Sequence, residues 1–241
     1  NFKLTPEKLL EKITDKTKIL VMPFPNNPTG AIMTKEDLAP IVDIIVKKDL
    51  FVISDEIYSE LTYGTDHVTI AAFPEMKDRT ILINGFSKSY AMTGWRLGYA
   101  AAPHRILEQM LKIHQFAIMC APTTSQYAAV SALRDGDNDV QMMREAYDQR
   151  RRFVLHAFKE MGLDCFEPEG AFSSIKRFGM TSDEFATRFL REEKVAVVPG
   201  TAFGASGEGF LRVSYAYSLK NLKEALGRMA NFVKRLDEER K

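Results

Sequence analysis

The sequence is poor in cysteine and has almost no net charge. Cys120 and Cys165 are the only cysteines among 241 residues, and they lie in neither a Cys-x-x-Cys nor a zinc-binding spacing. The chain therefore offers no disulfide framework, and a reducing cytoplasm fits it best. A formal net charge of +1 gives no general electrostatic field for nucleic acid or an anionic membrane. We expect a small-molecule partner instead.

Long apolar runs and metal-ligand motifs are also missing. No run approaches the roughly 20 apolar residues that span a bilayer, and the amino end lacks the layout of a signal peptide. The histidines, His67, His104, His114 and His156, are scattered without the His-Glu-x-x-His spacing, so we predict no metal site. The chain opens at Asn1 without an initiator methionine and reads like a chain entered midway. The remaining composition, 45% hydrophobic and 27% charged, is typical of a globular protein of one or two domains.

Helical patterns alternate with strand-like apolar runs in the first hundred residues. We expect a helix over 6–13, and a second helix from a capping box of Thr34 and Asp37 to Lys48. Strands are expected at 18–22, 50–53, 80–83 and 97–102. The order strand, helix, strand predicts parallel strands with right-handed crossovers, whose carboxyl ends lie together. Open α/β sheets hold their ligands at that end.

From residue 105 onward the pattern changes to long helices and short strands. Helices are expected at 105–113, 122–133, 139–161, 182–192 and from 219 to the carboxyl end, and strands at 170–175, 195–198 and 210–214. Thr181 and Glu184 form a capping box for the helix at 182. This mixed order predicts a smaller α+β domain after the parallel-sheet domain, with domain limits of 1–118 and 119–241.

The stretch from Asn84 to Gly98 reads NGFSKSYAMTGWRLG and directly follows the expected strand at 80–83. It places Lys88 just past the carboxyl end of a buried strand. Burial disfavours the charged form of a lysine, so we expect a nucleophilic amine suited to Schiff-base chemistry. Gly85, Gly94 and Gly98 carry no side chain, so other groups can approach the backbone closely. Arg96 supplies several hydrogen-bond donors in one plane, which suits a phosphate.

This fifteen-residue string resembles the cofactor-attachment signature of class I and II aminotransferases, which use pyridoxal 5'-phosphate. The resemblance implies that Lys88 binds the cofactor as a Schiff base and acts as general acid and base. It implies that Arg96, together with Ser87, binds the cofactor phosphate. Gly85 stands where many relatives have a phosphate-contacting serine, so one phosphate donor must come from elsewhere or be absent.

Three further motifs stand in the family's order. Asp55, in Asp-Glu-Ile-Tyr, ends an apolar strand, where desolvation of a carboxylate is costly without a partner. Taken alone, Asp55 could cap a helix or pair with a lysine, Tyr58 could simply pack, and Asn27 in Asn-Pro-Thr-Gly could be a turn residue. The resemblance implies that Asp55 keeps the cofactor's ring nitrogen protonated, and that Tyr58 and Asn27 donate to its phenolic oxygen. Arg212, inside the apolar strand 210–214, would bind the substrate's α-carboxylate, with Asn27 beside the substrate.

The resemblance covers nearly the whole chain and implies a fold-type I transferase: part of the large parallel-sheet domain, followed by the smaller α+β domain. It is nearest to the prokaryotic aspartate and aromatic amino-acid aminotransferases. It implies an enzyme of amino-acid metabolism that moves an amino group from an L-amino acid to a 2-oxo acid, in a cytoplasmic homodimer.

Besides Gly85, the chain departs from the family in two further places. The family's amino-terminal portion, with its glycine-rich phosphate loop, has no counterpart, so we expect an incomplete enzyme. The segment 170–175 is also shorter than the family's strand. Two alternatives stay open: a pyridoxal-phosphate-dependent β-lyase, and an aminotransferase-like sensor domain of a transcription regulator.

Overall fold

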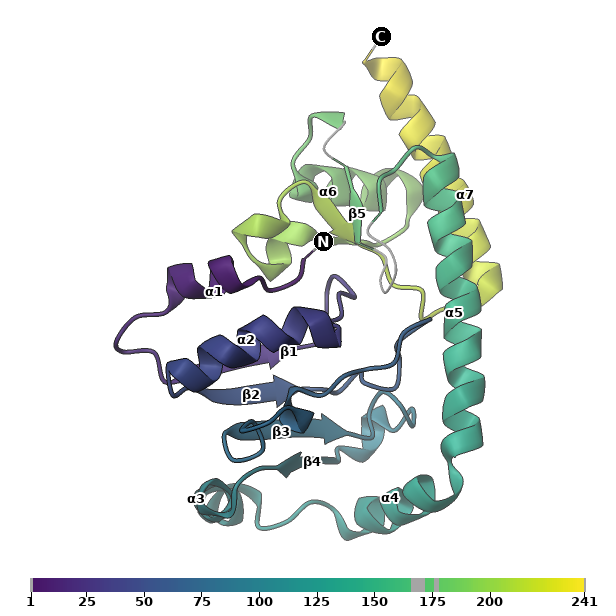
Figure 1. Cartoon of the computed structure of the whole chain (residues 1–241). Coiled ribbons are helices and arrows are strands. Elements are labelled where there is room, and N and C mark those ends of the chain that lie inside the picture. The colour runs from purple at the N-terminus through teal and green to yellow at the C-terminus, as the bar shows by residue number, and fades with distance from the viewer. Residues whose placement is uncertain (1, 166–171, 176–177, 241) are drawn as a thin grey trace. The chain divides into compact units, whose positions relative to one another are not determined.

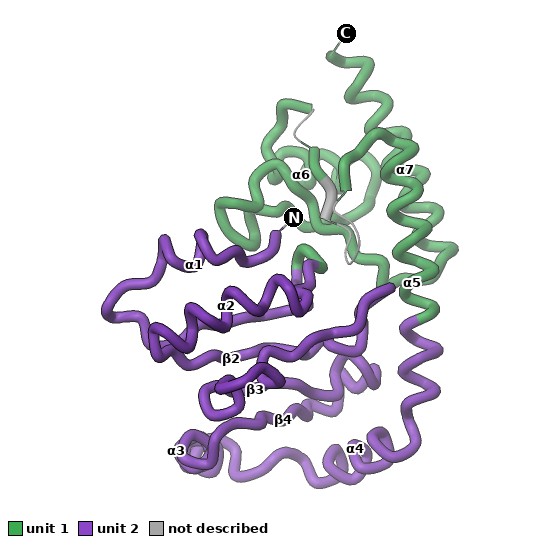
Figure 2. The backbone as a smooth tube through the Cα atoms, viewed as in Figure 1, with its two compact units in different colours: residues 1, 28–30, 145–241 green, residues 2–27, 31–144 purple. Residues whose placement is uncertain are grey.

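A computed structural model of the chain describes residues 2–165, 172–175 and 178–240 (Figure 1). Figure 2 shows two compact units in different colours. The N-terminal unit comprises residues 2–27 and 31–144, and the C-terminal unit comprises 28–30 and the described residues from 145 onward. The chain thus passes between the units at 144, later than the junction expected at 118. The domain limits 1–118 and 119–241 stay a prediction for the protein.

A four-stranded sheet in the order β1-β2-β3-β4 forms the N-terminal unit (Figure 1). Three strands run parallel, which confirms the expected order: β1 (Ile19–Pro23), β2 (Phe51–Asp55) and β3 (Thr80–Gly85). The last strand, β4 (Gly98–Ala101), runs antiparallel to β3. Pro23 pairs with Asp55, and Asp55 pairs with Ile83, so β1 and β2 end at one level and β3 continues two residues further, to Gly85.

Two capped helices accompany β1 and β2, as the sequence predicts. The first, α1 (Pro6–Lys12), starts at Thr5, whose hydroxyl accepts the Lys8 N–H. The second, α2 (Lys35–Lys47), starts with the expected capping box, in which the Thr34 N–H donates to Asp37 at 2.8 Å and the Asp37 N–H donates back at 3.3 Å. The buried face of α2 shares one apolar core with β2 and the end of β1, formed by Met22, Leu38, Ile41, Val42, Ile45, Leu50 and Val52.

Three helices follow β4: α3 (His104–Ile118), α4 (Thr123–Asp135) and α5 (Asp137–Glu160). The helix α3 continues past the expected end at 113, and within the described part of the chain it buries none of its side chains. Two short 3-10 helices, η1 (Ile70–Ala72) and η2 (Thr93–Trp95), stand in the connections before β3 and β4.

The C-terminal unit contains a small antiparallel sheet in the order β5-β7-β6. Its strands are β5 (Phe172–Ser174), β6 (Val198–Pro199) and β7 (Phe210–Arg212). The strands expected at 195–198 and 210–214 are both wrong in extent, because β6 pairs only with the last two residues of the short β7. Of the strand expected at 170–175, residues 170 and 171 lie outside the described residues.

Two helices, α6 (Ser182–Glu193) and α7 (Leu219–Glu239), supply most of the core of this unit. The predicted capping box of Thr181 and Glu184 starts α6. The rings of Phe158, Phe185, Phe189 and Phe232 are fully buried in this core, and those of Phe185 and Phe232 meet edge to face at 5.2 Å between centroids. None of the helices in the described ranges is long and apolar enough to cross a membrane.

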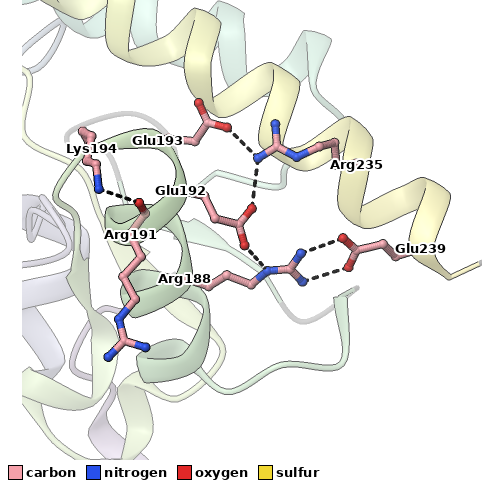
Figure 3. A network of polar contacts seen from close by, with 7 residues as sticks. All are labelled: Arg188, Arg191, Glu192, Glu193, Lys194, Arg235 and Glu239. Carbon is pink, nitrogen blue, oxygen red and sulfur yellow. Dashed lines mark hydrogen bonds and ion pairs between the residues drawn. The ribbon is translucent and has the colours of Figure 1, made fainter.

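Ion pairs join α6 to α7 at the surface (Figure 3). Arg188 donates to Glu192 at 2.5 Å and grips both carboxylate oxygens of Glu239 at 2.6 and 2.8 Å. Arg235 of α7 donates to Glu192 at 3.0 Å and to Glu193 at 2.5 Å. Hydrogen bonds to Glu239 and then Glu192 raise the pKa of the Arg188 guanidinium.

Candidate active site

The carboxyl ends of the parallel strands bring the first candidate residues to one end of the sheet. Asp55 is the last residue of β2 and is half-buried. Its Oδ1 accepts a hydrogen bond from the Ile57 N–H at 3.2 Å. Asn27 lies beyond the end of β1 and is exposed on a turn that the Asn26 N–H closes by donating to the Ala31 carbonyl at 2.9 Å.

Tyr58 and Lys88 come together at this end of the sheet. The Lys88 Nζ lies 5.7 Å from the centroid of the half-buried Tyr58 ring. Tyr58 stands three residues after the end of β2, and Lys88 stands three residues after the end of β3. The expected burial of Lys88 is wrong in this structure: its side chain is exposed, because it stands in the turn beyond the packed strands.

The loop that carries Lys88 is closed by its own backbone. The Phe86 N–H donates to the Leu97 carbonyl at 3.4 Å, and the Met92 N–H donates to the Phe86 carbonyl at 3.1 Å. Phe86 and Met92 are buried against Ala129 of α4 in a separate apolar cluster. The loop is therefore held at both its ends and its middle, which limits where Lys88 can move.

Arg96 and Ser87, the expected phosphate ligands, belong to the same loop. Ser87 is half-buried, whereas Arg96 is exposed and donates from Nη1 to the Thr93 carbonyl at 2.9 Å. Both Arg96 and Ala91 have a φ of 53°, in the left-handed region that residues with a side chain rarely adopt. Such backbone strain persists where surrounding contacts enforce it and concentrates at functional sites. One of those contacts is the Ser125 hydroxyl of α4, which donates to the Trp95 carbonyl at 2.7 Å.

The missing serine at position 85 has a steric explanation. A Cβ added to Gly85 would lie 2.9 Å from the Gly98 Cα and 3.0 Å from the Leu97 carbonyl oxygen. Both atoms are backbone and cannot turn away as a side-chain atom could. The close approach of β3 and β4 thus disfavours a side chain at 85, so this position supplies no side-chain donor to a phosphate.

Sequence reasoning missed Glu56, the residue after Asp55. Its side chain is buried, with a relative exposure of 3%. It accepts hydrogen bonds from Thr69 at 2.6 Å, His67 at 2.8 Å and Ser54 at 3.0 Å. Burial alone would raise the pKa of the Glu56 carboxyl, but these hydrogen bonds outweigh it, and the pKa is lowered. Because Glu56 lies between Asp55 and Tyr58, this buried network fixes the segment that carries both.

Arg212 is the candidate residue in the C-terminal unit. It ends β7, is half-buried, and its guanidinium Cζ lies 4.9 Å from the centroid of the Phe203 ring. The structure thus brings Lys88 and Tyr58 together in one unit and places Arg212 in the other. That Arg212 joins them in one site stays a prediction.

Comparison with known proteins gives the family. The chain matches the family model "Aminotransferase class I and II" over residues 1–229 and belongs to this family. It is 48% identical over 234 residues to the aspartate aminotransferase of Pyrococcus abyssi, covering 95% of this chain and 60% of that protein. It is 45% identical over 239 residues to the aromatic-amino-acid aminotransferase 2 of Thermococcus litoralis, covering 97% and 61%.

A solved structure agrees with this result. The aromatic aminotransferase from Pyrococcus horikoshii superposes with a TM-score of 0.94 and 46% identity, covering 97% of this chain and 64% of that one. The expected fold, fold type I, is confirmed. The chain spans about three fifths of the length of the relatives it matches, and neither the β-lyase nor the sensor-domain alternative is favoured by them.

Proposed function

We propose that the protein carrying this chain is a pyridoxal-phosphate-dependent transaminase. It moves an amino group from an L-amino acid, of the aspartate or aromatic type, to a 2-oxo acid. The observation that carries this proposal is the approach of the Lys88 amine to the Tyr58 ring, 5.7 Å away, beyond the sheet end where β2 finishes in Asp55. An amine, a phenol and a carboxylate are the groups that this cofactor's chemistry requires.

The side chains of the N-terminal unit fit pyridoxal 5'-phosphate in chemistry and charge. Asp55 would hold the ring nitrogen, Tyr58 and Asn27 the phenolic oxygen, and Lys88 the carbonyl carbon. Ser87 and Arg96, which belong to the same loop, would bind the phosphate, and Gly85 adds no side-chain donor to it. When bound, the cofactor supplies an electron sink for the bond broken at the substrate's Cα.

Each residue's task follows from its chemistry. An ionised Asp55 carboxylate stabilises a proton on the ring nitrogen, and the Tyr58 hydroxyl donates a hydrogen bond to the phenolic oxygen. The Lys88 Nζ would accept the proton from the substrate Cα as general base and deliver it, as general acid, to the cofactor's carbonyl carbon. Arg212 pairs its guanidinium edge with the substrate's α-carboxylate.

We further propose that the enzyme is a cytoplasmic homodimer. The helix α3 presents Ile113 and Phe116 to solvent, as does Met119 directly after its end, and Phe116 is 96% exposed. Contiguous apolar surface of this kind marks an interaction site. The low cysteine content, with Cys120 and Cys165 as the two cysteines of the sequence, suits a reducing compartment. Sedimentation velocity of the protein should show a dimer, and Phe116→Glu should shift it toward the monomer; a monomer at all concentrations would contradict this.

Labelling of Lys88 tests the function. Borohydride reduction of the protein loaded with pyridoxal phosphate, followed by peptide mapping, should place the pyridoxyl mass on Lys88. Lys88→Ala should abolish oxo-acid formation, whereas Lys223→Ala, at an exposed lysine of α7, should leave it unchanged. A label on another lysine would refute the assignment, and pyruvate release without an oxo-acid acceptor would indicate the β-lyase.

A further inference from the structure

The guanidinium of Arg212 lies over an aromatic ring. Its Cζ lies 4.9 Å from the centroid of Phe203, within the range in which a cation is attracted to the face of a ring. Phe203 is the last residue of η4 (Gly200–Phe203) and is 39% exposed. A ring with that exposure contributes little to the core of the C-terminal unit, so its contact with Arg212 needs another explanation.

The loop that carries Phe203 contains three glycines at positions where a side chain would clash or the backbone would be strained. A Cβ on Gly200 would lie 2.0 Å from the Gly207 carbonyl oxygen, and a Cβ on Gly207 would lie 2.1 Å from the Gly200 carbonyl oxygen. Between them Gly204 has φ 120° and ψ 166°, a conformation that is essentially restricted to glycine. The loop is thus folded tightly onto itself, with Phe203 at its turn.

Hydrogen bonds anchor both halves of this loop to the start of α6. In the first half, the Thr201 hydroxyl donates to Asp183 at 2.7 Å. In the second half, a Glu208 oxygen accepts the N–H groups of Ser182 and Gly209, both at 2.8 Å. The backbone hydrogen bond from Ser182 is the main cause of a lowered pKa of the Glu208 carboxyl, which keeps this anchor ionised. The Phe203 ring is therefore held in a fixed place beside β7.

We propose that Phe203 is a positioning residue for Arg212: its ring orients the guanidinium that binds the substrate's carboxylate. Stacking uses the flat face of the guanidinium, whereas a carboxylate binds through its N–H edge, so the two interactions are compatible. A guanidinium that is already oriented loses less side-chain freedom on binding, which improves affinity. This inference rests on the role of Arg212 in the proposed function.

Substitution of the ring tests the proposal in the protein loaded with pyridoxal phosphate. Phe203→Leu removes the aromatic face and keeps an apolar side chain, and Phe203→Tyr restores the face. For the leucine variant, loss of a cation–π contact should raise KM for the L-amino acid and Kd for hydrocinnamate about threefold to tenfold, with a smaller change in kcat. The tyrosine variant should stay near the parent, as should Tyr217→Leu, a matched change at an exposed aromatic residue of the same unit.

A second measurement does not depend on catalysis. The Arg212 Nε–H signal in heteronuclear NMR, assigned by its loss in Arg212→Lys, should carry a ring-current shift that disappears in Phe203→Leu and persists in Phe203→Tyr. Phe203→Met replaces the leucine variant if that one fails to fold. An unchanged Arg212 signal together with unchanged hydrocinnamate affinity would overturn the proposal. If both change as expected while the parent shows no transamination, the proposed function fails and the positioning role of Phe203 stands.

Discussion

At the scale of single residues, the contact between β3 and β4 makes Gly85 sensitive to any side chain. We predict that Gly85→Ser lowers the free energy of unfolding by about 1–3 kcal/mol, because an added Cβ must push two backbone segments apart. Gly94→Ser, in the same loop, is the matched control, since nothing lies within 4 Å of the added Cβ. Urea unfolding measures both, and equal midpoints for the two variants would contradict the steric explanation.

Glu56 gives the N-terminal unit a predictable response to acid. Its lowered pKa means that folding favours the ionised form, so its stabilisation is present above the unfolded pKa of about 4.3 and is lost as the pH falls through the folded value. We expect Glu56→Gln to lower the free energy of unfolding at pH 7 by about 1–3 kcal/mol, since buried hydrogen bonds are weakened. The difference from the parent should shrink below about pH 4, whereas exposed Glu60→Gln should change little throughout. A constant difference across the pH series would contradict this role.

The sequence predicts the placement of site residues better than their surroundings. Asp55 and Lys88 stand at strand ends because local apolar runs fix where each strand stops, and parallel order then brings the ends together. The exposure of Lys88 follows from its place in the turn three residues beyond β3, which the apolar run at 80–83 does not distinguish from a buried strand end. The partners of Glu56 at 67 and 69 are 11 and 13 residues distant, beyond a connection whose path the sequence does not specify.

At the scale of elements, the arginines between α6 and α7 stabilise the docking of the C-terminal helix. We predict that Arg188→Lys causes a small loss of stability, because lysine keeps the charge but cannot grip both oxygens of Glu239. The loss should fall as salt is raised, since exposed ion pairs are screened. Arg134→Lys, in an exposed pair with Asp135, should give no measurable change. Equal unfolding midpoints for both variants at low salt would show that the α6 to α7 pairs contribute nothing.

Helix starts were predictable and some ends were not. The capping boxes at Thr34 and Thr181 are local chemistry between residues three apart, and both are confirmed. The helix α3 runs on to Ile118, where Met119 turns with φ 60°, and no glycine or proline marks the earlier end that we expected at 113. The strand β6 depends on pairing with β7, so its bounds follow tertiary contacts that apolar runs do not reveal.

At the scale of the whole molecule, the solvent exposure of Lys88 and of α3 bears on whether the chain can catalyse transamination by itself. We predict that residues 1–241 expressed by themselves do not sustain transamination, because Lys88 is open to water and the apolar face of α3 is uncovered. The measurement adds pyridoxal phosphate to the isolated chain and follows both cofactor absorption and oxo-acid formation from several amino acids. Steady multiple turnover would contradict the prediction.

The helix α5 determines how the protein should respond to limited proteolysis and to truncation between its two units. The boundary between the units falls within it, between Arg144 and Glu145. Arg144 donates to the Thr62 carbonyl at 2.7 Å in the N-terminal unit, while Val154 and Phe158 belong to the core of the C-terminal unit. Limited proteolysis needs a segment that can leave its hydrogen-bonded structure, and a helix interior does not provide one. A protease should therefore spare this boundary, and a gene truncated at 144 would leave a stump, 137–144, too short to be a stable helix by itself.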